Sequence, residues 1–135
     1  MEKFKFLEHT ADIKFQAFGK SLNEGFENSA YALKEVMFSG IKVENKITKK
    51  IEVSGKDNPA LLYRFLEQFL YLLDAESFIF DKVKVSINKD KLKAEVSGDE
   101  ASKYKFTNDV KAITYNQMFV KEEKKKFIIQ VVLDV

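Results

Sequence analysis

The spacing of hydrophobic residues predicts strands at the start of the chain, followed by a helix. Apolar positions alternate with polar ones on both sides of residues 8–12, which predicts two strand segments joined or bent there and ending at Gly19. Residues 22–37 then carry apolar side chains at helical spacing. Ser21 and Glu24 form the capping-box pattern that opens such a helix. We therefore expect a helix over about residues 22–37.

A second, more apolar helix is expected after a short strand. The alternation in residues 47–53 predicts the strand, and Asn58 with Pro59 provides a cap and a first-turn proline for the helix. Leucine and phenylalanine recur on a wide stripe over residues 61–73. This stripe predicts a central core helix that packs on a sheet and ends near Asp74.

The next part of the chain has the two-residue alternation of strands. Residues 83–87 and 92–96 predict a hairpin that turns at residues 88–90. The polar run over residues 99–106 predicts a loop.

Two further strands are expected at the end, and they complete the predicted fold. They cover residues 110–120 and 127–135, with a charged turn at residues 122–125. The order of elements predicts a single α+β domain spanning residues 1–135. We expect two layers, in which a mostly antiparallel sheet carries both helices on one face.

Composition favours an ordinary globular domain and excludes several classes of protein. The chain has 135 residues, of which 45% are hydrophobic and 33% charged, with a formal net charge of only +2. These values predict a sizeable core and argue against a general polyanion binder. The absence of cysteine excludes disulfides and thiolate metal sites. No signal-peptide core and no apolar run long enough to cross a membrane is present, so we expect a cytoplasmic protein.

Acidic residues near both ends of the sequence are the main candidates for chemistry. The segment of residues 8–12 holds the only histidine and ends at Asp12, while Asp134 closes an otherwise apolar strand. A second carboxylate is expected at Val135. If Asp12 joins these two groups, the three negative charges need a cation, and oxygen ligands suit Ca²⁺, Mg²⁺ or Mn²⁺.

Three blocks of sequence make the chain resemble the archease family. In family order they are Phe6-Leu7-Glu8-His9-Thr10-Ala11-Asp12-Ile13, then Val110-Lys111-Ala112-Ile113-Thr114-Tyr115, then Val131-Val132-Leu133-Asp134-Val135. The resemblance covers nearly the whole chain. It implies that Asp12, Asp134 and the backbone oxygen of Val135 ligate a divalent metal, with Ca²⁺ expected as the bound ion and Mg²⁺ or Mn²⁺ as alternatives. Spacing in the sequence does not itself show that Asp12 and Asp134 meet.

Three more residues are candidates for the surroundings of the metal or for contact with a partner. His9 orients Asp12, ligates a softer ion or donates to a buried carbonyl, and we favour the first role. Lys111 flanks the site or faces a partner, unless it is simply a solvated lysine on a strand. Asp109 stands where archeases often carry Glu, and Asn116 where they commonly carry His. Asparagine forms hydrogen bonds but does not shuttle protons near neutral pH.

A purely structural role for the same residues also fits the sequence. Thr10 and Asp12 are residue types whose side chains commonly bond backbone amides in turns. Asp134, taken alone, fits a solvated strand end.

The resemblance implies a protein cofactor rather than an enzyme. An archease assists the GTP-dependent RNA-splicing ligase (RtcB type) in tRNA splicing by promoting ligase guanylylation and multiple turnover. The expected partner is then the ligase. The protein is expected to contact tRNA only indirectly, through the ligase, and to bind neither membrane nor DNA.

Two functions of other classes are the alternatives. One is a stand-alone metal-dependent enzyme, such as a small hydrolase with His9 as base. The other is an RNA-binding or chaperone-like adaptor that uses the lysine-rich residues 46–50 and 121–126. No glycine-rich phosphate loop and no serine nucleophile elbow is present, which argues against nucleotide hydrolysis and triad chemistry.

Overall fold

The strands of the protein form two separate antiparallel sheets in the computed structural model, which describes residues 2–135. One sheet has the strand order β1-β2-β7-β6 and the other has the order β3-β5-β4. In chain order the elements are β1 (Phe4–Leu7), β2 (Ile13–Gly19), α1 (Leu22–Met37), β3 (Ile47–Ser54), α2 (Asn58–Glu76), β4 (Phe78–Asn88), β5 (Lys91–Glu100), the short 3₁₀ helix η1 (Ala101–Lys103), β6 (Ala112–Glu123) and β7 (Lys126–Asp134).

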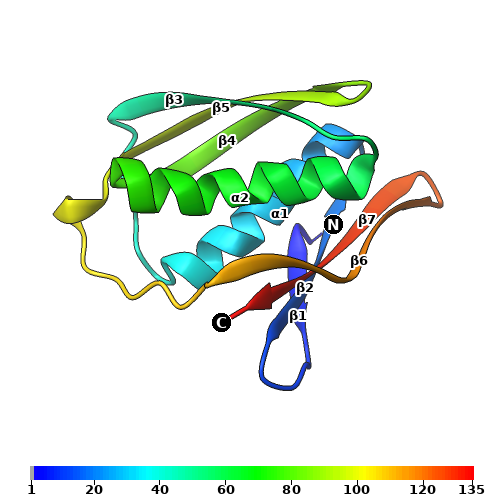
Figure 1. Cartoon of the computed structure of the whole chain (residues 1–135), viewed down its shortest axis with the longest axis horizontal. Helices are drawn as coiled ribbons and strands as arrows, with labels where there is room; N and C mark the ends of the chain where they lie inside the picture. The colour runs from blue at the N-terminus through cyan, green and yellow to red at the C-terminus, as the bar shows by residue number, and fades with distance from the viewer. Residues whose placement is uncertain (1) are drawn as a thin grey trace.

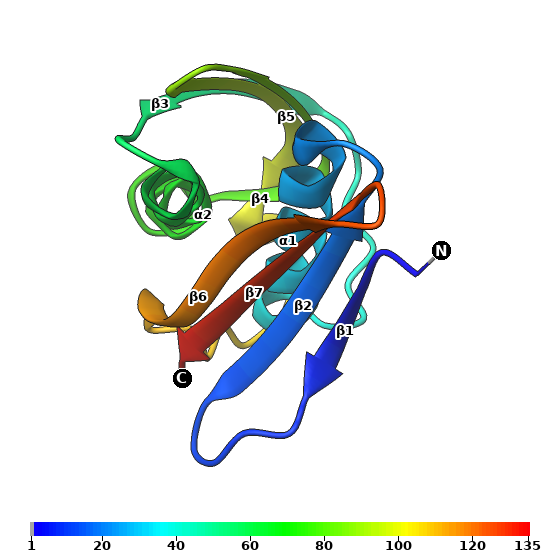
Figure 2. The ribbon, with the colours of Figure 1, turned by 90° about the vertical axis from the view of Figure 1, so that its right-hand side faces the viewer.

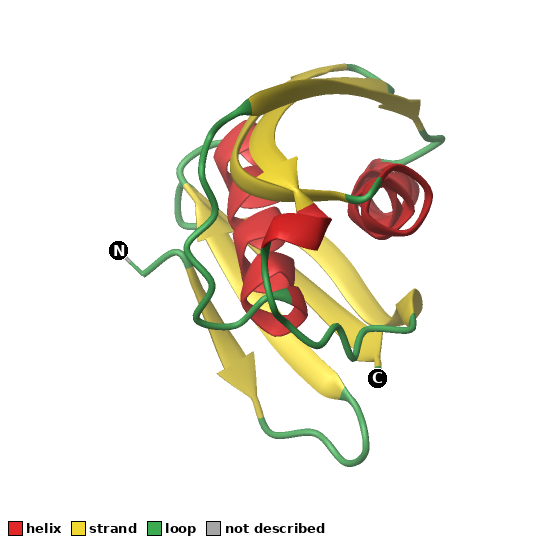
Figure 3. Cartoon of the chain, turned by 90° about the vertical axis from the view of Figure 1, so that its left-hand side faces the viewer, coloured by secondary structure: helices red, strands yellow, loops and turns green. Residues whose placement is uncertain are grey.

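Both helices lie between the two sheets (Figures 1 and 2). α1 packs against β2 and β7 of the first sheet and against β4 of the second, while α2 packs against β6, β3 and β4. The three-stranded sheet curves over α2 in Figure 3. The α+β class with two helices on antiparallel strands is confirmed. The sequence predicts a single sheet, whereas the structure has two. The helices are apolar over so much of their surface that one sheet does not cover them, and a second sheet packs on their other side.

The helix boundaries follow from local hydrogen bonds at the first turns. Oγ of Ser21 accepts the amide of Glu24 at 3.1 Å, as the capping box predicts, but the Glu24 carboxylate accepts the amide of Lys20 rather than that of Ser21. At α2 the cap is Asp57, whose carboxylate accepts an amide of the first turn at 2.8 Å, so the prediction of Asn58 as cap was one residue late. None of the described helices is long and apolar enough to cross a membrane.

Side chains of α1 accept hydrogen bonds from the backbone amides on the free edge of β4. Alternate amides of that strand donate to polar side chains that lie one helical turn apart on α1. The pairs are Ile87 with Asn23 Oδ1 (2.9 Å), Val85 with Glu27 Oε2 (2.8 Å) and Val83 with the Tyr31 hydroxyl (3.2 Å). The helix therefore takes the place of a further strand, and the edge is closed to pairing with another chain.

β5 extends into the run that the sequence predicts to be a loop. Asp99 lies within β5 and is only 1% exposed. Its carboxylate accepts the Tyr104 hydroxyl at 2.7 Å and the Glu100 amide at 2.8 Å, and Lys103 Nζ lies 3.3 Å away. The hydrogen bond from Tyr104 is the largest cause of a pKa lowered below the usual value for Asp99. The loop prediction was wrong here because these partners allow a charged residue to remain in a buried strand.

Candidate functional site

The ladder between β2 and β7 brings segments from opposite ends of the sequence together. Its terminal pair is Ile13 with Leu133, so Asp12 and Asp134 each lie one residue beyond the paired register. β6 lies on the other side of β7, where the amide of Lys111 donates to the carbonyl of Asp134 at 2.7 Å. The start of β2 and the C-terminal end of β7 therefore lie at the same end of the four-stranded sheet (Figure 2).

The Asp134 side chain belongs to the outer face of the sheet, which is turned away from the helices. Val131 and Leu133 of β7 are buried in the core, so the alternate residues, with Asp134 last among them, project outward. The outer face is mixed: Val132 is only 1% exposed, while Nε2 of Gln16 donates to Oε1 of Gln130 at 2.9 Å across the β2–β7 pair and Asp134 is exposed. Carboxylates at this end are therefore open to solvent or to an ion.

His9 lies against Asp12 inside the β1–β2 loop. Nδ1 of His9 is 3.5 Å from Oδ2 of Asp12, and the two side chains are 17% and 31% exposed. Ala11 between them has a φ of 66°, in the left-handed region, which is typical of the tight turns that bring such neighbours face to face. Nδ1 of His9 is buried and makes no hydrogen bond within residues 2–135. The imidazole therefore approaches the carboxylate without a hydrogen bond to it, and its role in orienting Asp12 stays a prediction.

β6 leaves its ladder with β7 next to this site. Thr114 pairs with Val132, and the next pair is Phe119 with Gln130, so residues 115–118 have no partner on β7. We name these four residues the β6 excursion. The alternation in residues 110–120 predicts one regular strand, without this irregularity. The only signal was the polar pair Asn116-Gln117 inside an otherwise apolar alternation.

Gln117 of the β6 excursion ties the outer face to the β1–β2 loop. Its backbone has a φ of 55° and its carbonyl accepts the side-chain amide of Gln130 at 2.9 Å. Its own side chain accepts Lys14 Nζ at 3.1 Å and lies 3.5 Å from Nε2 of His9. The sequence analysis did not select Gln117, although it is the residue that connects His9 with the sheet.

A divalent-metal site at this end of the sheet stays a prediction. Among residues 2–135 no cluster of three or more His, Cys, Asp and Glu side chains comes together. The ligands expected from the sequence, the carboxylates of Asp12 and Asp134 and the backbone oxygen of Val135, are oxygen atoms of the kind that a hard divalent cation prefers. The side chain of Val135 packs against the core, which anchors its backbone beside Asp134.

Two other residues singled out in the sequence have no polar side-chain contact at this site. Asp109 is exposed in the segment before β6, and its carboxylate makes no hydrogen bond or ion pair to residues 2–135. Asn116 is also exposed, and only its backbone amide is engaged, donating to Oγ1 of Thr114 at 3.3 Å. Both side chains therefore face solvent or a partner.

Comparison with known proteins gives a consistent family. A model of the archease protein family (MTH1598/TM1083) matches residues 4–135. The protein archease of Sulfurisphaera tokodaii is 39% identical over 139 residues and covers 100% of both chains. That of Thermococcus kodakarensis is 42% identical over 128 residues, 90% of each chain.

Solved structures resemble the fold over its whole length. The solution structure of Methanobacterium thermoautotrophicum protein 1598 superposes with a TM-score of 0.87 at 35% identity and covers 100% of both chains. The crystal structure of a Thermotoga maritima archease, described as a possible chaperone, gives a TM-score of 0.70 at 21% identity, with 97% and 96% covered. The second likeness concerns the fold alone.

Proposed function

Because the chain belongs to the archease family, we propose that it is a non-catalytic cofactor of the GTP-dependent RNA-splicing ligase in tRNA splicing. In this role it promotes guanylylation of the ligase and supports multiple turnover. The reaction takes place on the ligase, and this chain contributes groups to it while the two proteins are docked.

The observation that supports the proposal best is the β2–β7 register, which ends at Ile13 and Leu133, the residues next to Asp12 and Asp134. Continued by one residue, this register would set Asp12 opposite Asp134, and directly facing residues of an antiparallel pair lie about 5 Å apart. Two carboxylates this close repel one another unless a cation neutralises them. The pairing therefore supports a divalent-ion site at the end of the sheet.

The groups around this pair have separate roles in the proposal. Asp12 and Asp134 hold the ion, and His9 orients Asp12 through the approach of Nδ1 to Oδ2 at 3.5 Å. Lys111, which is exposed and bonded by its backbone to Asp134, adds a positive charge to the same end. When bound, a divalent ion supplies positive charge that neutralises phosphate oxygens. Few protein ligands leave room for such oxygens beside the ion.

The RNA-binding alternative gains little from the lysine-rich stretches. Three of their lysines lie beside carboxylates, Lys49 with Glu76 (2.7 Å), Lys121 with Glu123 (3.3 Å) and Lys46 with Glu44 (3.6 Å). Paired lysines contribute less positive potential to a phosphate backbone than free ones do. We therefore favour the ligase cofactor.

The proposal is tested by ligase turnover with and without this protein, across a panel of Ca²⁺, Mg²⁺ and Mn²⁺. We expect the ligase alone to join about one RNA per enzyme and to turn over repeatedly once the protein is added. An identical yield with and without the protein, at every metal, would contradict the proposal. RNA turnover by this protein without ligase would favour the stand-alone enzyme. An RNA affinity of the isolated protein that falls steeply with rising salt concentration would favour the adaptor.

A further inference from the structure

An exposed stripe of α2 carries tyrosines and carboxylates in alternation. The four residues Tyr63, Glu67, Tyr71 and Asp74 follow at helical spacing and share one side of the helix. Tyr115 of the β6 excursion stacks on Tyr63, with ring centroids 4.3 Å apart and planes 6° from parallel. We name these five residues the tyrosine face.

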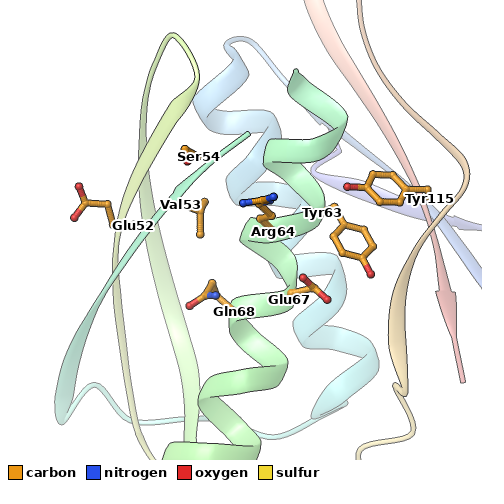
Figure 4. A pocket seen from close by; sticks show the side chains of 8 residues that line it. All are labelled: Glu52, Val53, Ser54, Tyr63, Arg64, Glu67, Gln68 and Tyr115. Carbon is orange, nitrogen blue, oxygen red and sulfur yellow. The ribbon is translucent and has the colours of Figure 1, made fainter. Parts of the chain in front are cut away.

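The tyrosine face is open to solvent and borders a cleft. Tyr71 is 55% exposed and Tyr115 is 54% exposed, the largest exposed fractions among the big hydrophobic and aromatic residues of the described chain. The cleft, of about 540 Å³, lies over α2 between β3 and Tyr115 (Figure 4). In Figure 4 the stacked pair stands on one side of α2, with the Glu67 carboxylate near the Tyr63 ring. Stacking holds the exposed ring of Tyr115 in place, which makes it a rigid anchor for a partner.

The charge of the tyrosine face differs from that of the rest of the chain. The sequence has 23 Lys and Arg residues, yet the 19 residues of α2 include no lysine and only Arg64. At the end of α2 the Glu76 carboxylate has a lysine partner, Lys49 at 2.7 Å. Glu67 and Asp74 form no ion pair with any residue in the range 2–135. These two carboxylates are therefore available to cations from outside the chain.

The tyrosine rings also have no cation of their own. Lysine ammonium groups lie 5.0 to 6.0 Å from the centroids of five other aromatic rings. Those rings belong to Phe18, Tyr31, Phe78, Phe80 and Phe119. In the part of the chain that the structure describes, no lysine lies over Tyr63, Tyr71 or Tyr115. An aromatic face binds a cation favourably, so the exposed rings of Tyr71 and Tyr115 can accept one from outside the chain.

We propose that the tyrosine face docks a segment of the partner ligase that carries lysine or arginine side chains. The inference rests on the proposed function, because the ligase is the partner in both. A guanidinium or ammonium group lies over the Tyr115 ring and the neighbouring carboxylates pair with further cations. Tyrosine anchors of this kind are enriched among the residues that dominate binding energy at protein interfaces. RNA fits less well, since Glu67 and Asp74 repel phosphates.

The tyrosine face is continuous with the candidate metal site. Tyr115 and Gln117 belong to the same β6 excursion, and Gln117 reaches His9 on the outer face of the sheet. The β6 excursion therefore contributes to both surfaces, with Tyr115 stacked on Tyr63 of α2 and Gln117 next to His9. The β6 excursion thus contacts both α2, where the partner is proposed to dock, and the loop that carries Asp12.

The test measures binding of purified, immobilised ligase to variants of this protein. We expect Tyr115→Ala and the double variant Glu67→Lys/Asp74→Lys each to weaken binding by about tenfold or more. Tyr115→Phe keeps the ring and binds within about threefold of wild type. The matched control is Glu95→Lys/Glu122→Lys, which reverses two exposed carboxylates away from α2 and leaves binding unchanged. Equal thermal midpoints of all variants exclude unfolding as the cause.

The outcomes separate this inference from the proposed function. If wild-type protein binds and stimulates the ligase while both face variants bind equally well, the docking inference is overturned and the cofactor function stands. If wild-type protein neither binds nor stimulates the ligase, both are overturned. If the variants lose affinity for a labelled single-stranded RNA but keep ligase binding, the face is an RNA platform and the inference is wrong. Loss of binding in the face variants alone supports it.

Discussion

Nε2 of Gln117 lies 3.5 Å from Nε2 of His9, although 108 residues separate them in the sequence. The contact joins the β6 excursion to the β1–β2 loop, and His9 in turn approaches Asp12 at 3.5 Å. The imidazole thus lies between the Gln117 amide and the Asp12 carboxylate. We propose that Gln117 positions His9 in the candidate site.

Removal of the Gln117 side chain is expected to weaken metal binding. Gln117→Ala frees the His9 ring, and loss of such an outer contact typically lowers metal affinity by about tenfold. Calorimetric titration with Mn²⁺ or Ca²⁺ measures the change directly. Asn116→Ala is the control, since the neighbouring side chain is exposed and makes no hydrogen bond within residues 2–135. Equal affinities for the two variants would show that Gln117 does not position the site.

The edge of β4 gives a prediction about stability. Glu27→Ala removes the acceptor of the Val85 amide and leaves a half-buried donor unpaired, which costs roughly 1 to 3 kcal/mol. Urea denaturation followed by circular dichroism gives the free energy of unfolding. Glu35→Ala, the same substitution at an exposed site of the same helix, should change it by less than about 0.5 kcal/mol. Similar losses in both variants would mean that the edge contact adds nothing.

Asp99 gives a prediction about pH dependence. The hydrogen bond from Tyr104 lowers the pKa of Asp99 in the folded protein below its usual value. The stability contributed by the ionised group is then complete above about pH 4 and is lost as the pH falls through the lower, folded pKa. Asp99→Asn should therefore lower the thermal midpoint most at neutral pH, and the difference from wild type should shrink below about pH 3. A difference that stays constant over pH 2.5 to 7 would contradict this origin.

Most of the fold could be predicted from the sequence because its local signals agree with one another. The capping pattern at Ser21 and the turn at residues 88–90 place α1 and the β4–β5 hairpin where the structure has them. The division of the strands between two sheets could not be predicted from the sequence. The alternation of apolar residues shows which side chains are buried, but it does not show which layer of the fold they pack against. The extension of β5 through Asp99 depends on the hydrogen bond from Tyr104, so the local pattern of apolar and polar residues does not predict it either.

The candidate site was predictable only in part. The resemblance to archeases selected Asp12 and Asp134, and the β2–β7 register pairs their neighbours Ile13 and Leu133 although these are far apart in sequence. Gln117 was missed because its role depends on a break in the β6–β7 ladder, and the sequence around it reads as a continuous strand. Long-range register and strand irregularities are tertiary properties, which a periodic pattern does not encode.

The most direct test of the account measures ligase stimulation by Asp12→Ala and Asp134→Ala. Both residues lie at the surface end of their strands, so we expect both variants to keep the wild-type thermal midpoint. Glu95→Ala, which removes an exposed carboxylate from β5, is the charge-matched control. The account predicts that multiple turnover of the ligase is lost with either aspartate variant and kept with the control. Full stimulation by either folded aspartate variant would contradict a cation shared between these two strands.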